Sequence, residues 1–348
     1  MSCQLTLLVP GLLQPPQPLQ ALPPQEQPGF ISLNRFFGRA RKSESYTNGF
    51  YPSLFSLFGS VTAEKTDYPV AALTHLIDSG DRTNAWTLRC DPVCFQADMD
   101  RVVLQGHGAL GLSVDEVDQL ITILNAHIEQ DGWQIEALTK ERWYVQGAKQ
   151  VDVSTTPPAL LLGKDIKHDL PRGKDGAYWR SLMNECQMLL HELPMNVQRQ
   201  EKGLLPVTGL WFWGCGALPA STSCQYDRIY GSSALVAGLA QNAACAYESI
   251  GALWQFVEQG QDTKILAVSE TLQSPLVSQD LYSWLDAVAQ FEEEFIQPLL
   301  ERLNKKMFSQ VNLLSADGRA FQLTPGLLRH WWKRQTKFNS LLAEATHA

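Results

Sequence analysis

The sequence predicts an α/β protein whose core is interrupted by an α+β insert. Toward both ends of the chain, short apolar strands such as LTLLV, RIYG and KILAVS alternate with helical segments. In the middle, paired strand-like segments surround a single amphipathic helix. The 348 residues, of which 45% are hydrophobic, suffice for one large domain or two ordinary ones.

The first part of the chain begins with a strand over residues 5–9, which Pro10-Gly11 ends. This strand resembles a signal-peptide core, but no Lys or Arg precedes it and no small-residue cleavage site follows. A Pro- and Gln-rich stretch through Pro28 predicts an extended loop or covering arm. Helices are expected at residues 31–40 and 70–77.

The middle part contains the clearest helix. Ser113 can cap its first turn, Glu116 completes a capping box, and an apolar stripe continues to the stop at Asp131-Gly132. The segments TLRCDPVCF and RVVLQG before it alternate like strands. WQIEAL and RWYVQG after it flank TKE like a hairpin, so this part is α+β.

The last part opens with the stretch PVTGLWFWGCGALP. Residues 210–213 predict a parallel strand covered on both faces, and glycines directly after such a strand are typical of a site in a crevice. Further on, RIYG leads to a helix in SALVAGLAQNAA, and KILAVS leads to a long helix over about residues 279–303. VNLLSADGRAFQL predicts a hairpin turning at Asp317-Gly318.

The charge and cysteine content restrict the partners. A formal net charge of -8 argues against general binding to nucleic acid or to anionic membranes, and no apolar run is long enough to cross a bilayer. Small ligands and proteins remain as partners. The seven cysteines are odd in number, scattered and without CxxC pairs, which favours reduced thiols and a cytoplasmic location.

The run HELPMNVQRQEKGLLPVTGLWFWGCGALP resembles a segment of archaeal-type cofactor-independent phosphoglycerate mutases, members of the alkaline phosphatase superfamily. It is still more similar to a bacterial branch variously described as phosphoglycerate mutase or RpfE-type regulatory protein, which has counterparts of CDPVCFQADMDRVVL and NECQMLLHE. The resemblance implies a three-layer alkaline-phosphatase-like core at residues 1–89 and 206–348. Residues 90–205 would then form an inserted α+β domain.

The same resemblance implies a ligand-binding segment. The residues that match the mutase pattern there are Asn196, Arg199, Trp213, Gly214 and Gly216. The chain departs from the pattern at Leu193, where histidine is usual, and at Cys215, where glutamine is usual. Arg199 would either grip a phosphate or carboxylate ligand or form an ion pair holding the insert to the core. Core packing is the favoured role of Trp211 and Trp213.

Enzymes of this superfamily move a phosphoryl group with two divalent metals held by several Asp and His side chains. In this chain no acidic residue occurs before Glu26, and no Asp-His-Gly tripeptide is present. The segment AVSETLQSPLVSQDLYSW offers Glu270 and Asp280 but no histidine. Near the expected nucleophile, Ser43, Ser45 and Thr47 lack the expected Gly-Ser-Asp context. We therefore expect no bound metal and no cofactor, and the sequence identifies no catalytic residue.

Three other groups of residues have a functional and an ordinary interpretation. His127 and Asp131 either begin a metal site or form a solvated helix end, which is the commoner case. Residues 329–334, RHWWKR, either contact nucleic acid or belong to an amphipathic terminal helix. A Cys186–His191 pair would need an orienting group that the sequence does not show. The ordinary interpretation is favoured in each case.

These observations predict a bacterial, cytoplasmic pseudoenzyme that has lost the two-metal site. It would bind a small phosphorylated or carboxylate ligand, or a protein partner, in a regulatory role. The alternative is an active cofactor-independent phosphoglycerate mutase with relocated ligands. A third hypothesis is a structural partner protein that binds no small ligand.

Overall fold

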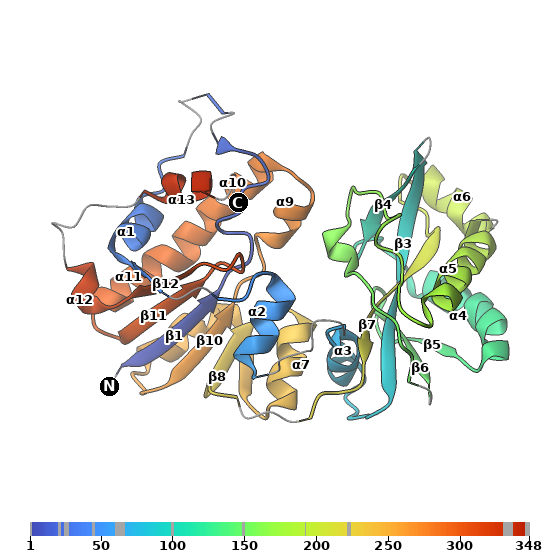
Figure 1. Ribbon diagram of the computed structural model, residues 1–348, viewed down its shortest axis with the longest axis horizontal. Helices are drawn as coiled ribbons and strands as arrows, with labels where there is room; N and C mark the ends of the chain where they lie inside the picture. The colour runs from blue at the N-terminus through green and yellow to red at the C-terminus, as the bar shows by residue number, and fades with distance from the viewer. Residues whose placement is uncertain are drawn as a thin grey trace. The chain divides into compact units, whose positions relative to one another are not determined.

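The computed structural model describes residues 2–19, 22–23, 28–43, 46–59, 67–98, 101–147, 150–191, 193–220, 224–329 and 337–344 (Figure 1). The chain forms two compact units: unit 1 comprises residues 1–61 and 221–348, and unit 2 comprises residues 62–220. Unit 2 is therefore inserted into the sequence of unit 1. The divisions fall at residues 61/62 and 220/221, whereas the sequence predicted them at 89/90 and 205/206.

Unit 1 is built on a seven-stranded sheet with the strand order β2-β12-β11-β1-β10-β8-β9. Strands β11, β1, β10, β8 and β9 are parallel. At one edge β12 pairs antiparallel with β11, and β2 pairs antiparallel with β12. The strands are β1 (Cys3–Leu8), β2 (Arg41–Lys42), β8 (Arg228–Gly231), β9 (Ala246–Ser249), β10 (Lys264–Val268), β11 (Phe308–Leu314) and β12 (Ala320–Leu323).

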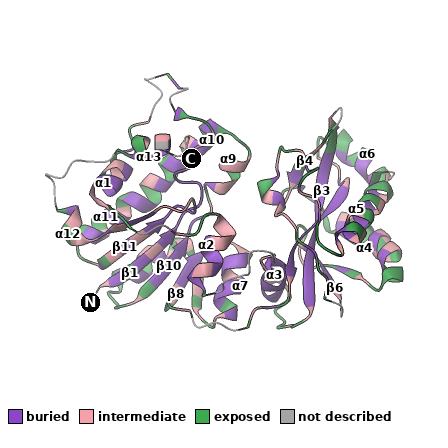
Figure 2. Cartoon of the chain, in the orientation of Figure 1, coloured by how far each residue is buried: buried purple, intermediate pink, exposed green. Residues whose placement is uncertain are grey.

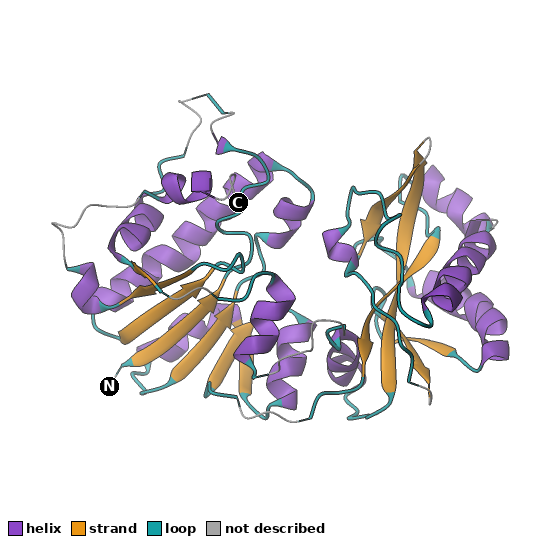
Figure 3. Cartoon of the chain, viewed as in Figure 1, coloured by secondary structure: helices purple, strands orange, loops and turns teal. Residues whose placement is uncertain are grey.

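Helices cover both faces of this sheet, as Figure 3 shows, so unit 1 has the three layers expected of an α/β core. Alternate residues of β1 and β10 belong to one hydrophobic cluster, while the residues between them face the opposite layer. The helices of unit 1 are α1 (Ile31–Arg39), α2 (Phe50–Leu57), α7 (Ala234–Asn242), α8 (Leu253–Glu258), α9 (Gln273–Val277), α10 (Leu281–Phe291), α11 (Gln297–Asn304), α12 (Pro325–Leu328) and α13 (Phe338–Glu344).

The long helix predicted over residues 279–303 is interrupted. A π-helical turn at Glu292–Ile296 separates α10 from α11. The Glu292 carboxylate accepts a hydrogen bond of 2.8 Å from the backbone N–H of Leu33, near the start of α1. An unsatisfied N–H at the start of one helix is thus paired by the irregular turn of another.

Unit 2 contains a five-stranded antiparallel sheet in which β3 is the longest strand and pairs with β4, β6 and β7. Figure 2 shows that β3 is largely buried, and so is β7. The strands are β3 (Trp86–Asp98), β4 (Arg101–His107), β5 (Gln134–Ala137), β6 (Trp143–Gly147) and β7 (Gly209–Gly216). The helices are α3 (Val70–Ser79), α4 (Val114–Ile128), α5 (Gly176–His191) and α6 (Pro194–Glu201).

Several local predictions are confirmed. The β5–β6 and β11–β12 hairpins form where expected, and α3 ends at Gly80, which has the left-handed φ of 75°. Both halves of the capping box are present at the start of α4: the Ser113 side chain accepts from Glu116 N–H, and the Glu116 carboxylate accepts from Ser113 N–H.

The placement of the Trp-rich strand is corrected by the structure. β7 is buried on both faces as predicted, but it pairs antiparallel with β3 in unit 2 and is not a parallel strand of the core. Phe212 packs against Trp179 of α5, and Trp211 packs against Phe95 of β3. A strand covered on both faces has the same apolar pattern in either kind of sheet, so the sequence pattern did not distinguish them.

Candidate functional site

The first candidate site is the carboxyl edge of the parallel strands in unit 1, where α/β proteins of this kind bind ligands. Backbone hydrogen bonds join the loops there: Val9 N–H donates to Leu314 O at 2.8 Å, and Ser269 N–H donates to Leu8 O at 3.0 Å. The loop after β1 turns at Gly11, which has a φ of 84°. The Trp284 indole donates to the carbonyl of that glycine at 2.9 Å and fixes the turn.

Glu270 lies at this edge, in the loop that follows β10. Its Oε2 atom is buried and has no hydrogen-bond partner among the described residues. Burial raises the pKa of Glu270, and a hydrogen bond from Ser233, the cap of α7, opposes that rise. A carboxyl group in this setting favours the protonated form and is a poor ligand for a cation.

The resemblance to the mutases would place a two-metal centre at this edge, but the residues that the structure describes do not fit one. Asp317, in the turn between β11 and β12, is engaged by Arg319 at 2.7 Å and by the Ser315 hydroxyl. Nowhere in the described part of the chain do three or more His, Cys, Asp or Glu side chains form a group able to hold a metal ion. Two divalent ions need several carboxylate or imidazole ligands each.

The second candidate site lies in unit 2, around the segment that resembles the mutases. Asn196 is buried; its amide donates to Leu190 O and Val207 O, and its Oδ1 accepts from Val207 N–H. Arg199 is 1% exposed and donates to Leu205 O at 2.9 Å, to Glu116 at 3.0 Å and to Leu110 O. The expected ion pair of Arg199 exists, but it joins α6 to α4 within unit 2.

Trp213 belongs to a buried polar network centred on Asp91. The Asp91 carboxylate, fully buried in β3, accepts two hydrogen bonds from Arg89 at 2.7 and 2.8 Å, one from the Trp213 indole at 2.7 Å, and lies 3.0 Å from His107 Nε2. The Arg89 guanidinium also lies over the Trp213 ring, 5.2 Å from its centroid. Burial would raise the pKa of Asp91, but the Arg89 charge, with His107 and the indole, lowers it.

The sequence did not predict this network. One signal was available: Asp91 is a single acidic residue inside the apolar strand CDPVCF, and a buried carboxylate needs a partner. Its partner Arg89 lies two positions away, on the same face of the strand. The partners from β4 and β7 required the sheet pairing to be known.

Gly214 and Gly216 lie against the start of α3, where the sequence had predicted an open crevice. A Cβ on Gly214, which has a φ of 66°, would lie 3.0 Å from Val70 Cβ. A Cβ on Gly216 would lie 2.8 Å from Pro69 Cβ. The Gly214 N–H donates to the Thr155 hydroxyl at 2.9 Å. Close packing of chain segments therefore explains why glycine stands at both positions.

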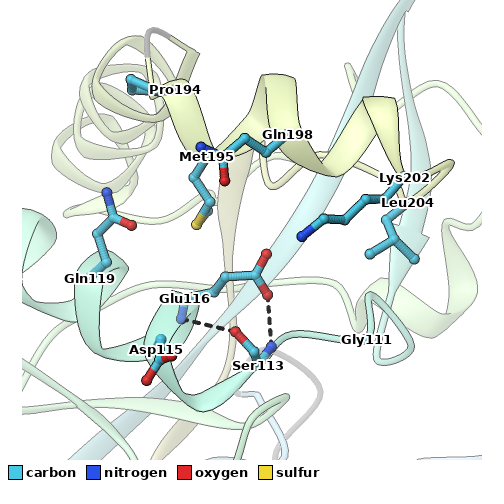
Figure 4. A pocket seen from close by; sticks show the side chains of 10 residues that line it. All are labelled: Gly111, Ser113, Asp115, Glu116, Gln119, Pro194, Met195, Gln198, Lys202 and Leu204. Carbon is cyan, nitrogen blue, oxygen red and sulfur yellow. Dashed lines mark hydrogen bonds between the residues drawn. The ribbon is translucent and has the colours of Figure 1, made fainter.

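A pocket of about 450 Å³ opens beside Arg199, between the start of α4 and α6 (Figure 4). Figure 4 shows the Lys202 ammonium and the Gln198 amide on the α6 side, facing Ser113, Glu116 and Gln119 of the α4 side. The capping box and the ion pair of Glu116 with Arg199 fix the wall of this pocket. No pattern in the sequence had singled out Lys202.

The remaining sequence candidates form no site in the described residues. His127 Nε2 lies 2.8 Å from Glu185, and Asp131 accepts from Tyr178, so these two do not converge on one point. Cys186 is buried, and its raised pKa, to about 12 by burial, keeps it a thiol. Residues 330–334 of the basic and aromatic cluster lie outside the described residues.

Comparison with known proteins identifies relatives of this chain. A 2,3-bisphosphoglycerate-independent phosphoglycerate mutase of Methanosarcina mazei is 24% identical over 239 residues, covering 62% of this chain and 60% of the mutase. The corresponding mutase of Methanothrix thermoacetophila is 39% identical over 80 residues, 23% of this chain and 20% of that one. Over these stretches the chain is similar to cofactor-independent phosphoglycerate mutases. It spans about 60% of the length of the M. mazei mutase that it matches.

The fold comparison agrees with the α/β class. The PH0037 protein from Pyrococcus horikoshii superimposes on the mutase-like chain with a TM-score of 0.53 at 14% identity, over 97% of this chain and 91% of that one. No family model matches the sequence. In the described residues, no helix combines the length and apolar character needed to cross a membrane.

Proposed function

We propose that this mutase-like chain has lost the two-metal site of its relatives and acts in a regulatory role, by binding a ligand or a protein partner. The carboxyl edge of the sheet supports this. Burial of Glu270 there favours its neutral form, and Asp317 is already paired with Arg319. Phosphoryl transfer in this fold needs metal ions to stabilise the charge on the transferred group.

The pocket in unit 2 is where we place the ligand, a small phosphorylated or carboxylate compound. The Lys202 ammonium supplies the positive charge of the pocket, in which Glu116 is already paired with Arg199, and the Gln198 and Gln119 amides supply donors from α6 and α4. Asn196 and Arg199 contribute by holding α6 in place, because their polar groups are used within the protein. In the structure, neither Asn196 nor Arg199 directs a hydrogen-bond donor into the pocket.

The proposed loss of mutase chemistry can be tested on the purified protein. Metal content is measured, and conversion of 3-phosphoglycerate to 2-phosphoglycerate is followed with and without added Mn²⁺. We expect no stoichiometric metal and no turnover above the background without protein. Turnover that a chelator abolishes would contradict the proposal and establish the alternative, an active mutase with relocated ligands.

Ligand binding is tested separately by the shift in thermal unfolding on adding 3-phosphoglycerate or 2-phosphoglycerate. A ligand at 100 times its dissociation constant stabilises the folded state by about 2.7 kcal/mol. Lys202→Gln should remove the shift, and Lys140→Gln, at an exposed lysine in the β5–β6 turn, should leave it unchanged. No shift with either compound would favour a protein partner as the occupant of this surface.

A further inference from the structure

Unit 1 has a pocket of about 710 Å³ between the start of α1 and the helical segment that runs from α10 through the π-helical turn into α11. Figure 1 shows α1 beside this segment. One side of the pocket is formed by residues 28–32 and Arg35 of α1. The other side presents exposed residues that recur every four positions: Ala289, Glu293, Gln297 and Glu301. None of these residues lines the pocket beside Lys202.

The two sides of this pocket are fixed to each other. The Glu292 carboxylate, in the π-helical turn, accepts a hydrogen bond of 2.8 Å from the backbone N–H of Leu33 in α1. Phe30, Leu33 and Leu300 are buried in the hydrophobic cluster of unit 1. Because both helices are anchored in one core, the side chains that line the pocket keep their relative positions.

An apolar side chain protrudes at the rim of the pocket. Among the large apolar side chains that the structure describes, Ile31 is the most exposed, at 81%. Arg35 follows it by four positions, so the two side chains lie on one face of α1. Removing an isoleucine side chain from water is favourable, so a partner that covers Ile31 gains free energy of association.

Charges of both signs at the pocket have no partner within the described part of the chain. The ion pairs among the described residues of unit 1 are Arg228–Glu248, Arg302–Glu258 and Arg319–Asp317. Arg35, Glu293 and Glu301 belong to none of these pairs, and all three are exposed. The α1 side of the pocket therefore presents a cation, and the opposite side presents two anions.

We propose that this surface, the Ile31 patch (Ile31, Arg35, Glu293 and Glu301), binds a second copy of the chain about a two-fold axis. In such an interface every contact occurs twice, because the same patch is used by both copies. A cation and two anions on opposite sides of one patch meet this requirement: Arg35 of each copy pairs with Glu293 or Glu301 of the other. Ile31 of each copy then enters the pocket of the other.

A basic protein or peptide is the competing occupant of the Ile31 patch. It would pair with Glu293 and Glu301, but its positive charges would face Arg35 on the other side of the same pocket. A second copy supplies opposite charges to both sides, and like charges placed together across an interface oppose binding. Charge complementarity therefore favours the second copy.

The test is sedimentation equilibrium of the full chain, which should show a dimer that dissociates on dilution. Ile31→Ser should raise the dissociation constant of the dimer about a hundredfold or more, because both copies lose a buried side chain. Arg35→Glu makes the patch wholly negative, and the double variant Glu293→Lys with Glu301→Lys makes it wholly positive. Each should be monomeric alone, and an equimolar mixture of the two should form a heterodimer. Lys264→Glu, exposed at the start of β10, should leave the dimer unchanged.

All the substituted side chains are exposed, and circular dichroism of each variant checks that it folds. Three results would overturn the proposal: a wild-type chain that is monomeric at every concentration, a dimer that survives the charge reversals, or a mixture of the two reversed variants that stays monomeric. Binding of a labelled oligolysine peptide to a monomeric wild-type chain, lost in the Glu293→Lys and Glu301→Lys variant, would assign the patch to a basic partner instead. None of these outcomes bears on mutase turnover or on ligand binding at Lys202.

Discussion

The Asp91 network gives the sharpest test of what holds unit 2 together. Asp91→Asn keeps the shape of the side chain but removes the charge, and it leaves the Arg89 guanidinium, 5% exposed, without its counter-ion. Removing one partner of a buried ion pair costs about 3–5 kcal/mol, because the other charge remains desolvated. Folded domains are stable by about 5–15 kcal/mol, so this single change should remove a large part of that margin.

Strand β3 itself provides the control. Asp98 forms an ion pair with Arg101 at 2.6 Å, but both side chains are exposed, and such pairs contribute about 0–1 kcal/mol. Urea unfolding of Asp91→Asn and Asp98→Asn, followed by tryptophan fluorescence, should therefore differ by several kcal/mol. Adding Arg89→Met to Asp91→Asn should recover part of the loss. Equal effects of the two Asn variants would refute the assigned role of burial.

Further expectations concern glycine, capping and pH. In urea unfolding, Gly214→Ala should destabilise unit 2 more than Gly203→Ala. Both glycines have positive φ, but only at Gly214 would a Cβ lie 3.0 Å from a valine side chain. Equal losses of stability in the two variants would contradict this. Ser113→Ala should cost about 0.5–2 kcal/mol and lower the melting temperature, since it removes the cap of α4. Because the pKa of Asp91 is lowered, its stabilisation is present above the unfolded pKa of about 3.9 and lost as pH falls through the folded value, and Asp91→Asn should abolish that acid dependence. The raised pKa of Glu270 has the opposite sign: its contribution is lost as pH rises, so Glu270→Gln should stabilise the protein more at pH 7 than at pH 4.

Local signals in the sequence predicted many elements correctly. The α4 helix was recognisable from its apolar stripe and its Ser113–Glu116 capping box, both of which depend on residues three or four positions apart. The β11–β12 hairpin was recognisable from Asp317-Gly318.

Partners distant in the chain could not be assigned in this way. Arg199 was recognised as important, but its contacts with Glu116 and Leu110 O join segments more than 80 positions apart. The glycines after Trp213 were interpreted as a ligand crevice because a glycine tolerates either a ligand or another chain segment nearby. Only the packed structure shows which of the two approaches, and here it is the start of α3.

The sequence by itself determined the α/β class, the helix and hairpin positions and the resemblance to the mutases, since these depend on residue type and short-range spacing. Tertiary structure alone decided that β7 joins the sheet of unit 2 and that Asp91 lies against Arg89, His107 and Trp213. The physical reason is that the spacing of apolar residues indicates how deeply a segment is buried, whereas its neighbours depend on which strands pair with one another in the folded chain.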